Sequence, residues 1–186
     1  MLRLASLTTA LLATLALAGC GTPSQPLPMA VTAASALQIR GWVPDALKSQ
    51  VGIAPVKGGE DTNRWWGSKV SAIALQQALE DSLYAVGMKP PAPVPAPRYE
   101  LQAELEPLDQ PQVPALGVTV GVAVRYTLID RSDGRVVVYQ RRIANTDEAS
   151  LGDAIVSPSE RLRIANERAL RANIDLLLRD LVTLRP

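Results

Sequence analysis

Two carboxylates, Glu104 and Glu106, are the side chains whose spacing comes nearest to a catalytic arrangement. In an extended strand, residues two positions apart share one face and lie about 7 Å apart. That separation falls within the range of the carboxylate pairs of glycoside hydrolases, so the pair could cleave a glycosidic bond. The same residues also fit a solvated strand face, where charged side chains normally lie. A raised carboxylate pKa in a deep cleft would favour the hydrolase.

The other residues that usually carry chemistry are scarce. The chain contains no histidine, and Cys20 is its one cysteine. Histidine is the usual general base and the commonest metal ligand, so Ser-His and Cys-His nucleophile arrangements are excluded. We identify no set of residues for a metal ion or another cofactor. The sequence therefore predicts a protein that is not an enzyme.

The residues before Cys20 form a secretory pattern. Arg3 precedes an apolar run over residues 4–17, and the small residues Ala18 and Gly19 follow. This is the layout of a signal peptide. The run is too short to span a bilayer, which needs roughly 20 apolar residues. An ordinary signal peptide with an incidental cysteine is the alternative, but the cleavage context coincides with the sole cysteine.

Leu17-Ala18-Gly19-Cys20 resembles the lipobox of bacterial lipoproteins. The resemblance implies cleavage before Cys20, a diacylglycerol on its sulfur and an acyl chain, such as palmitate, on its new amine. Three chains would hold the protein stably on a membrane, at about 0.8 kcal/mol per buried CH₂. By family analogy, Gly21 rather than Asp after the cysteine favours the periplasmic face of the outer membrane.

Charge and composition narrow the class of partner. The chain has 19 Lys and Arg against 18 Asp and Glu, and loss of Arg3 with the signal leaves 18 against 18. No basic excess indicates nucleic acid or anionic lipid headgroups. An acylated Cys20 leaves no thiol for a disulfide, and the chain lacks phenylalanine. The core must therefore form from Leu, Val, Ile and Ala by packing alone.

Three segments follow from these patterns. Residues 1–19 are the predicted signal peptide, and residues 20–36 are the predicted lipidated cysteine with a flexible tether. The tether prediction rests on three prolines among small polar residues, which bury little surface. Residues 37–186 form a single predicted periplasmic domain, with residues 37–43 either a strand or a docked extension.

Polar and apolar alternation predicts strands, and a stripe every three or four residues predicts helices. The predicted strands are 51–56, 99–106, 118–128 and 135–145, and the predicted helices are 68–86 and 157–182. Ser157-Pro158-Ser159-Glu160 fits a capping box that opens the last helix, whose buried seam should include Leu162 and Leu176. The predicted fold class is α+β: a two-layer sandwich with a mainly antiparallel sheet of about four strands and two helices packed on one face.

Trp65 and Trp66 are the candidate contact residues for a partner. Adjacent tryptophans in a glycine-flanked loop cannot easily both enter one core, and tryptophan is enriched at binding hot spots. The alternative is that at least one ring covers the open end of the helix–sheet core, where a chain without phenylalanine needs bulky side chains.

The order of elements resembles the YajG-like small α/β envelope lipoproteins. The residues that carry this resemblance are the lipobox, Ala78–Leu83 with Gly87, the strand 99–105, and Ala169 with Asn173-Ile174. The resemblance implies a non-enzymatic accessory or scaffolding role in the cell envelope through protein binding. The alternative is lipid or lipopolysaccharide handling, which an apolar cavity of a few hundred Å³ would favour.

Overall fold

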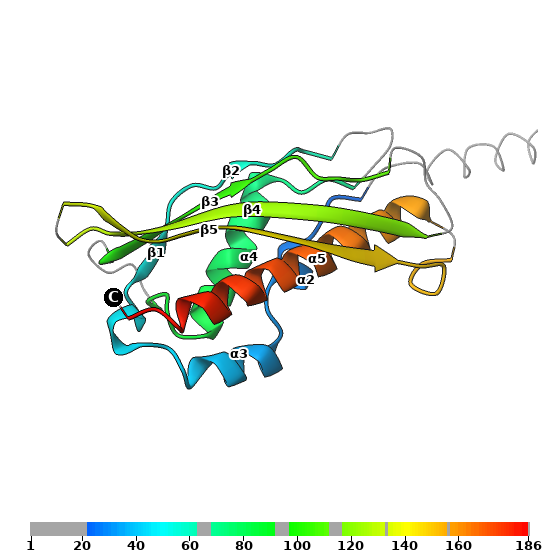
Figure 1. Ribbon diagram of the computed structural model, residues 1–186. Coiled ribbons are helices and arrows are strands. Elements are labelled where there is room, and N and C mark those ends of the chain that lie inside the picture. The colour runs from blue at the N-terminus through cyan, green and yellow to red at the C-terminus, as the bar shows by residue number, and fades with distance from the viewer. Residues whose placement is uncertain are drawn as a thin grey trace, which may run out of the picture.

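The computed structural model describes residues 22–62, 68–91, 97–111, 117–132, 134–155 and 157–185. They form one open, five-stranded sheet with helices packed against one of its faces (Figure 1). The predicted α+β class, with one solvated sheet face, is confirmed. None of the helices in these ranges is long and apolar enough to cross a membrane.

The sheet is built around the predicted antiparallel meander. Its strands are β1 (Val51–Ile53), β2 (Lys57–Gly58), β3 (Tyr99–Leu105), β4 (Val118–Asp130) and β5 (Val136–Ala149). The strand order is β1-β3-β4-β5, and β2 also pairs with β3. Both short strands run parallel to β3. The predicted strand 51–56 is too long, because β1 ends at Ile53, before Pro55, which has no N–H to give to a ladder, and β2 begins only after the predicted range.

Strand β5 is longer than its sequence indicates. The predicted strand ended at Asn145, with a polar loop after it, whereas pairing with β4 continues to Ala149 opposite Val118. The sequence does not indicate this extension, because Asp147 and Glu148 have low strand propensity. Residues 146–149 are in a strand because they pair with the apolar strand β4.

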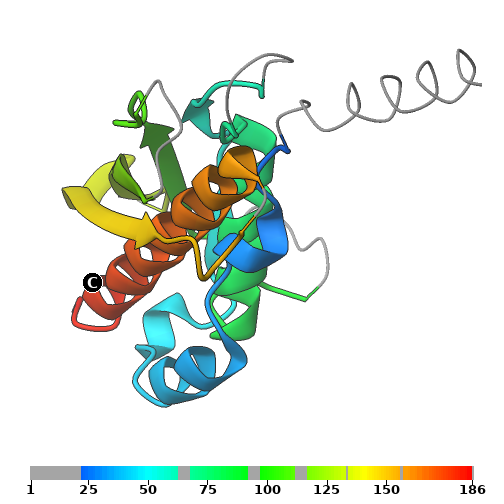
Figure 2. The same ribbon diagram turned by 90° about the vertical axis from the view of Figure 1, so that its right-hand side faces the viewer.

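Helices α4 (Ala72–Ala85) and α5 (Pro158–Leu181) cover the apolar face of the sheet, and the two shorter helices before them, α2 (Pro26–Met29) and α3 (Ala33–Arg40), pack on α4 and α5 (Figures 1 and 2). A short 3₁₀ turn covers Asp45–Leu47. Helix α4 begins four residues later than predicted, where the Ser71 side chain accepts a hydrogen bond from the Ala74 N–H at 3.2 Å. It is followed by Gly87, at φ +81°, which ends the helix as predicted.

Helix α5 begins at the predicted cap. The Ser157 hydroxyl accepts from the Glu160 N–H at 3.3 Å, and Pro158 occupies the first turn. The Glu160 carboxylate binds Arg163. The expectation that Leu176 belongs to the buried seam is wrong, since its side chain is 40% exposed. Leu162 is buried as predicted. The buried residues of α5 are Arg161, Leu162, Ala165, Asn166, Glu167, Ala169, Leu170, Asn173, Ile174, Leu177, Leu178 and Leu181.

Candidate functional site

The segment that follows Cys20 packs onto the domain. Met29 is fully buried, and Ser24 and Ala36 are nearly so. The Ser24 N–H donates to the Lys69 carbonyl at 3.2 Å, and the Val31 N–H donates to the Ser82 hydroxyl at 3.1 Å. The flexible-tether prediction is therefore wrong for residues 22–36. Its prolines allow a first turn at Pro26, and the apolar residues Met29 and Val31 are buried beside α4.

Helix α5 holds the same segment through charged side chains. The Glu167 carboxylate accepts from the Gln25 N–H at 2.7 Å and from Arg163 at 2.6 Å. One turn along, Arg171 donates to the Pro28 carbonyl at 2.7 Å. Gln25 precedes the four-residue α2 and Pro28 lies within it, so both contacts pair backbone groups that such a short helix leaves without a partner.

A buried polar group secures the start of this segment. Asn166, fully buried on α5, donates to the Ser68 carbonyl at 3.0 Å and accepts from Gln110 at 3.1 Å. The Ser68 hydroxyl lies 3.2 Å from that of Ser24. Four parts of the chain that are far apart in sequence therefore meet where the first described residues enter the fold.

The predicted signal peptide and Cys20 lie outside the described residues. Residue 22, the first one described, is two positions after Cys20. Fully extended chain spans at most about 3.6 Å per residue, so four steps from Cys20 to the buried Ser24 cover about 14 Å at most. A lipid on Cys20 would hold the body of the domain within that distance of its attachment.

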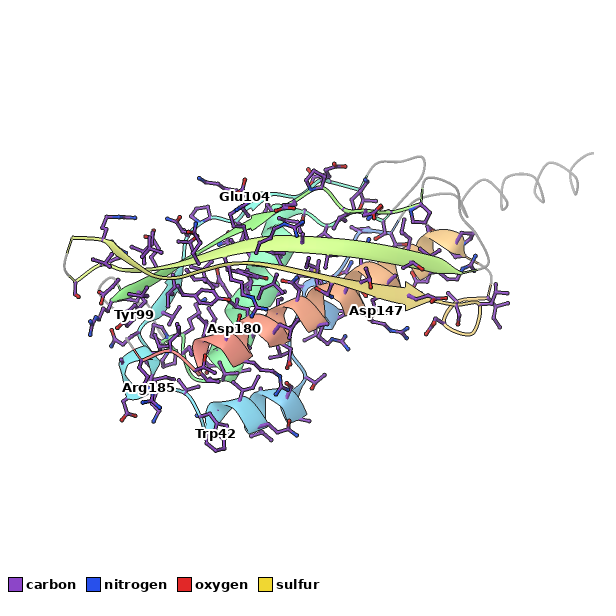
Figure 3. The ribbon with its side chains drawn as sticks, in the orientation of Figure 1. Trp42, Tyr99, Glu104, Asp147, Asp180 and Arg185 are labelled. Atoms are coloured by element: carbon purple, nitrogen blue, oxygen red, sulfur yellow. The ribbon has the colours of Figure 1, made fainter. Side chains whose placement is uncertain are left out.

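The solvated face of the sheet carries the carboxylates singled out by sequence. Figure 3 shows Glu104 on the side of the sheet away from α5. Arg125 lies 3.9 Å from Glu104 and 3.5 Å from Glu106, so the sheet does bring both carboxylates to one guanidinium. Arg142 of β5 binds Glu106 through two nitrogens, at 2.9 and 2.8 Å. The same pattern recurs along β3, where Arg131 and Arg135 flank Glu100.

Neighbouring side chains lower the pKa of two of these carboxylates, Glu106 and Glu100. The Arg142 hydrogen bonds lower the pKa of Glu106, and the Gln102 amide, with Arg135 and Arg131, lowers that of Glu100. A glycosidase acid needs the opposite shift, because it must hold a proton at neutral pH. The arrangement fits a solvated ladder of ion pairs, which is the alternative that the sequence left open.

Two hollows of the described surface are open to solvent and have charged side chains on their walls. One of about 290 Å³ lies beside the carboxylate pair and is lined by Gly59, Lys69, Glu104 and Glu106. A second, of about 550 Å³, lies between Thr32, α5 and the end of β5, with Arg168, Arg171 and Asp175 on its walls. The helix–sheet interface itself is filled by side chains of one contiguous core.

Trp65 and Trp66 lie outside the described residues. The chain on either side of them is held together, because Thr62 exchanges hydrogen bonds with Lys69 at 3.0 and 3.3 Å. The structure adds one candidate that the sequence reasoning missed. Trp42, after α3, is 76% exposed and points away from the domain (Figure 3). Its only signal was residue type, in a segment expected to be a strand or a docked extension.

Comparison with known proteins gives a fold but no family. No family model matches the chain, and no curated protein is a significant match to its sequence. Among solved structures, a Xanthomonas campestris protein of the family DUF330 has 16% identity and a TM-score of 0.52, over 76% of this chain and 90% of that chain.

Two further structures are described as lipoproteins. A putative lipoprotein from Caulobacter crescentus has 15% identity and a TM-score of 0.49, over 78% of this chain and 93% of that chain. A minor lipoprotein from Acinetobacter baumannii has 14% identity and a TM-score of 0.48, over 74% and 93%. At such identities, the similarity to the Xanthomonas protein shows that the two chains share a fold.

Proposed function

We propose that this chain is a bacterial envelope lipoprotein, anchored through an acylated Cys20 on the periplasmic face of the outer membrane, with a non-enzymatic accessory role in binding another envelope protein. The observation that carries the proposal is the packing of residues 22–31 directly after the lipobox. Ser24 is buried and hydrogen-bonded, so an acyl anchor at Cys20 would hold the domain against the bilayer. Such a geometry presents a fixed side of the domain to partners in or near the membrane.

The solvated sheet face is the surface that we propose for protein binding. It carries paired charges of both signs on three neighbouring strands, from Glu100 on β3, and Glu106 directly after it, to Arg142 on β5. Charges held in place by ion pairs give orientation and specificity to an interface more than raw affinity. Trp65 and Trp66 remain proposed contact residues, and Lys69, three positions after Trp66, accepts a hydrogen bond from the Ser24 N–H of the segment that follows Cys20.

Lipid handling is the second candidate, and the described interior gives it little support. A buried acyl chain needs an apolar cavity, whereas the space between helices and sheet is occupied by Leu, Val, Ile and Tyr side chains. The groove beside α5 has the required volume, about 550 Å³, but two arginines and two aspartates line it, which is unsuited to an acyl chain.

The anchor is tested by Cys20→Ala. Without the thiol no diacylglycerol can be attached, so we expect the variant either uncleaved or released from the outer-membrane fraction. The matched control is Gly21→Asp, which keeps the thiol and, by family analogy, moves the lipidated protein to the inner membrane. Membrane fractionation with a lipid-sensitive gel shift reads both. A Cys20→Ala protein that is cleaved normally and still pellets with the outer membrane would refute the anchor.

The tryptophans are tested separately. If both rings cover the core, Trp65→Ala and Trp66→Ala each lose roughly 3–5 kcal/mol of stability. If one is a contact residue, its variant melts like the unmodified protein but loses a crosslinked partner in whole cells. Destabilisation of both variants, or retention of every crosslink, would remove the contact proposal and leave the anchor untouched.

A further inference from the structure

The outer edge of β5 is an unpaired strand edge. Within the described ranges β5 pairs with β4 alone, over Val136–Ala149, and no further strand follows it in the sheet. Figure 2 shows β5 at one side of the sheet with α5 next to it. A long edge with free backbone groups is a template for another strand, and proteins normally block it with charge, proline or a covering segment.

The hydrogen bonds on the edge of β4 that faces away from β5 show which N–H and C=O groups of β5 point outward. Gly121 exchanges two hydrogen bonds with Asp109, at 3.0 and 2.8 Å, so its N–H and C=O point away from β5. These directions alternate along a strand, so Val122 points toward β5, where it pairs with Asn145. Asn145 is therefore bonded inward.

The alternate residues of β5 direct their N–H and C=O groups outward. Arg142, Ala144, Thr146 and Glu148 form this row, and all four side chains are exposed on the solvated face. Two described side chains reach the row, both at its last residue: Asp147 accepts from the Glu148 N–H at 2.8 Å, and Arg168 lies 3.5 Å from the Glu148 carbonyl. That distance is at the limit of a hydrogen bond, so the contact is weak.

The charges along this edge have opposite signs in its two halves. Arg141 and Arg142 lie in the first half, and Asp147 and Glu148 lie in the second. A single sign throughout would repel a second copy of the strand. With opposite signs, an antiparallel second copy brings the basic half of each strand to the acidic half of the other, which stabilises the pairing.

We propose that two copies of this chain pair through the outer edges of β5, antiparallel, about a two-fold axis at Asn145. In this register Arg142 lies opposite Glu148 of the partner subunit, and Ala144 lies opposite Thr146 of the partner subunit. Opposed residues point to the same face of a sheet, which the register satisfies. Arg142 already binds Glu106, and its five N–H donors allow both contacts.

Helix α5 supplies a second reason for this partner. Ala172 and Leu176 are exposed on α5 and line the groove that reaches Asp147 of β5. Asn145, at the axis, donates to the Ala169 carbonyl at 2.7 Å, so the axis passes beside the turn that carries Ala172. The second α5 would cover this apolar pair, and a small residue at the crossing lets the helices approach.

The dimer is independent of the anchor, although the two are compatible. A two-fold axis places equivalent residues of both subunits at equal height along the axis. Both N-terminal segments can therefore enter one bilayer that lies perpendicular to the axis.

The test is the self-association of the full chain, purified in mild detergent and measured by density-matched analytical ultracentrifugation. We expect a reversible dimer. Glu148→Arg should weaken dimerisation at least about tenfold, because it places two arginines opposite each other at both symmetric positions. Arg142→Glu should do the same, and the double variant should return to near the original constant. Glu104→Arg, the same reversal on β3 and away from the edge, should leave dimerisation unchanged.

A backbone variant keeps the proposal falsifiable if a charge reversal perturbs the fold. Ala144→Pro removes an outward N–H at an edge position, where proline is tolerated, so the thermal melt should change little while the dimer is lost. A monomer at all concentrations would overturn the proposal, even if the strand accepts a peptide from another protein. A dimer that survives both Ala144→Pro and the charge reversals would overturn it as well.

Discussion

The buried and exposed faces of α5 do not separate cleanly into apolar and polar residues. The buried face includes the amides Asn166 and Asn173, both fully buried, whereas the exposed face includes Ala172 and Leu176. Apolar spacing alone assigns Leu176 to the core, because it follows Leu162 and Ala165 at helical intervals. The comparison shows that available partners, more than residue class, decide which stripe of this helix is buried.

Asn173 illustrates the point. Its amide donates to the Ile143 carbonyl at 2.9 Å and to the Asn145 side chain at 2.8 Å. Its oxygen accepts from the buried Tyr126 hydroxyl at 2.9 Å. A buried polar group with its partners present costs little, whereas the same group unpaired costs several kcal/mol. The amide therefore fits where β4, β5 and α5 meet.

The largest effect on this comparison should come from Leu177→Asp. Leu177 is fully buried, so the variant would place a carboxylate without a partner in the core. We expect a loss of several kcal/mol, comparable with the whole stability of a small domain. Circular dichroism on heating would show a variant that is largely unfolded at 25 °C. A cooperative melt near that of the unmodified protein would mean that this face of α5 is not in the core.

Asn173→Ala should have the next largest effect. It leaves the Tyr126 hydroxyl without its acceptor, and we expect a loss of about 2–4 kcal/mol in urea unfolding. Tyr126→Phe in the same background should restore part of the loss, because it removes the unpaired hydroxyl. Equal costs of Asn173→Ala with and without Tyr126→Phe would show that the two side chains are not coupled.

A smaller, pH-dependent effect is expected at the start of α5. Arg168, at 2.5 Å, and the Ser150 N–H lower the pKa of Asp153 to about 2, against about 3.9 in an unfolded chain. The carboxylate therefore favours the folded state above about pH 4, and this contribution disappears as the pH falls toward 2. The melting temperature of Asp153→Asn should lie below that of the unmodified protein at pH 6. A gap that persists at pH 2 would contradict this assignment.

Leu176→Asp should have the smallest effect and serves as the neighbour control for Leu177→Asp. Its side chain is already 40% exposed, so we expect a change within about 0.5 kcal/mol at a concentration at which the chain is monomeric. Unfolding by urea would measure it. A loss as large as that of Leu177→Asp would restore the seam predicted from sequence.

Local signals determined much of the fold. The turn residues and alternation around β3 and β4 predicted the meander, and Ser157-Pro158 located the start of α5, because caps and strand faces depend on near neighbours. The same reasoning brought Glu104 and Glu106 to one face and left open whether they were catalytic. Their pairing with Arg125 and Arg142 depends on two other strands, so the lowered pKa of Glu106 could not be deduced from spacing.

The sequence alone determined the lipobox-like run, the absence of histidine and the alternation that builds one sheet with a solvated face. Tertiary structure decided the rest. Residues 22–36 looked too poor in apolar surface to order themselves, yet α4 and α5 supply donors, acceptors and a site for Met29 that no local pattern encodes. The outward row of β5 likewise emerges only when β4 takes the other side. Both depend on contacts between residues distant in sequence, because burial and hydrogen bonding are set by neighbours in space.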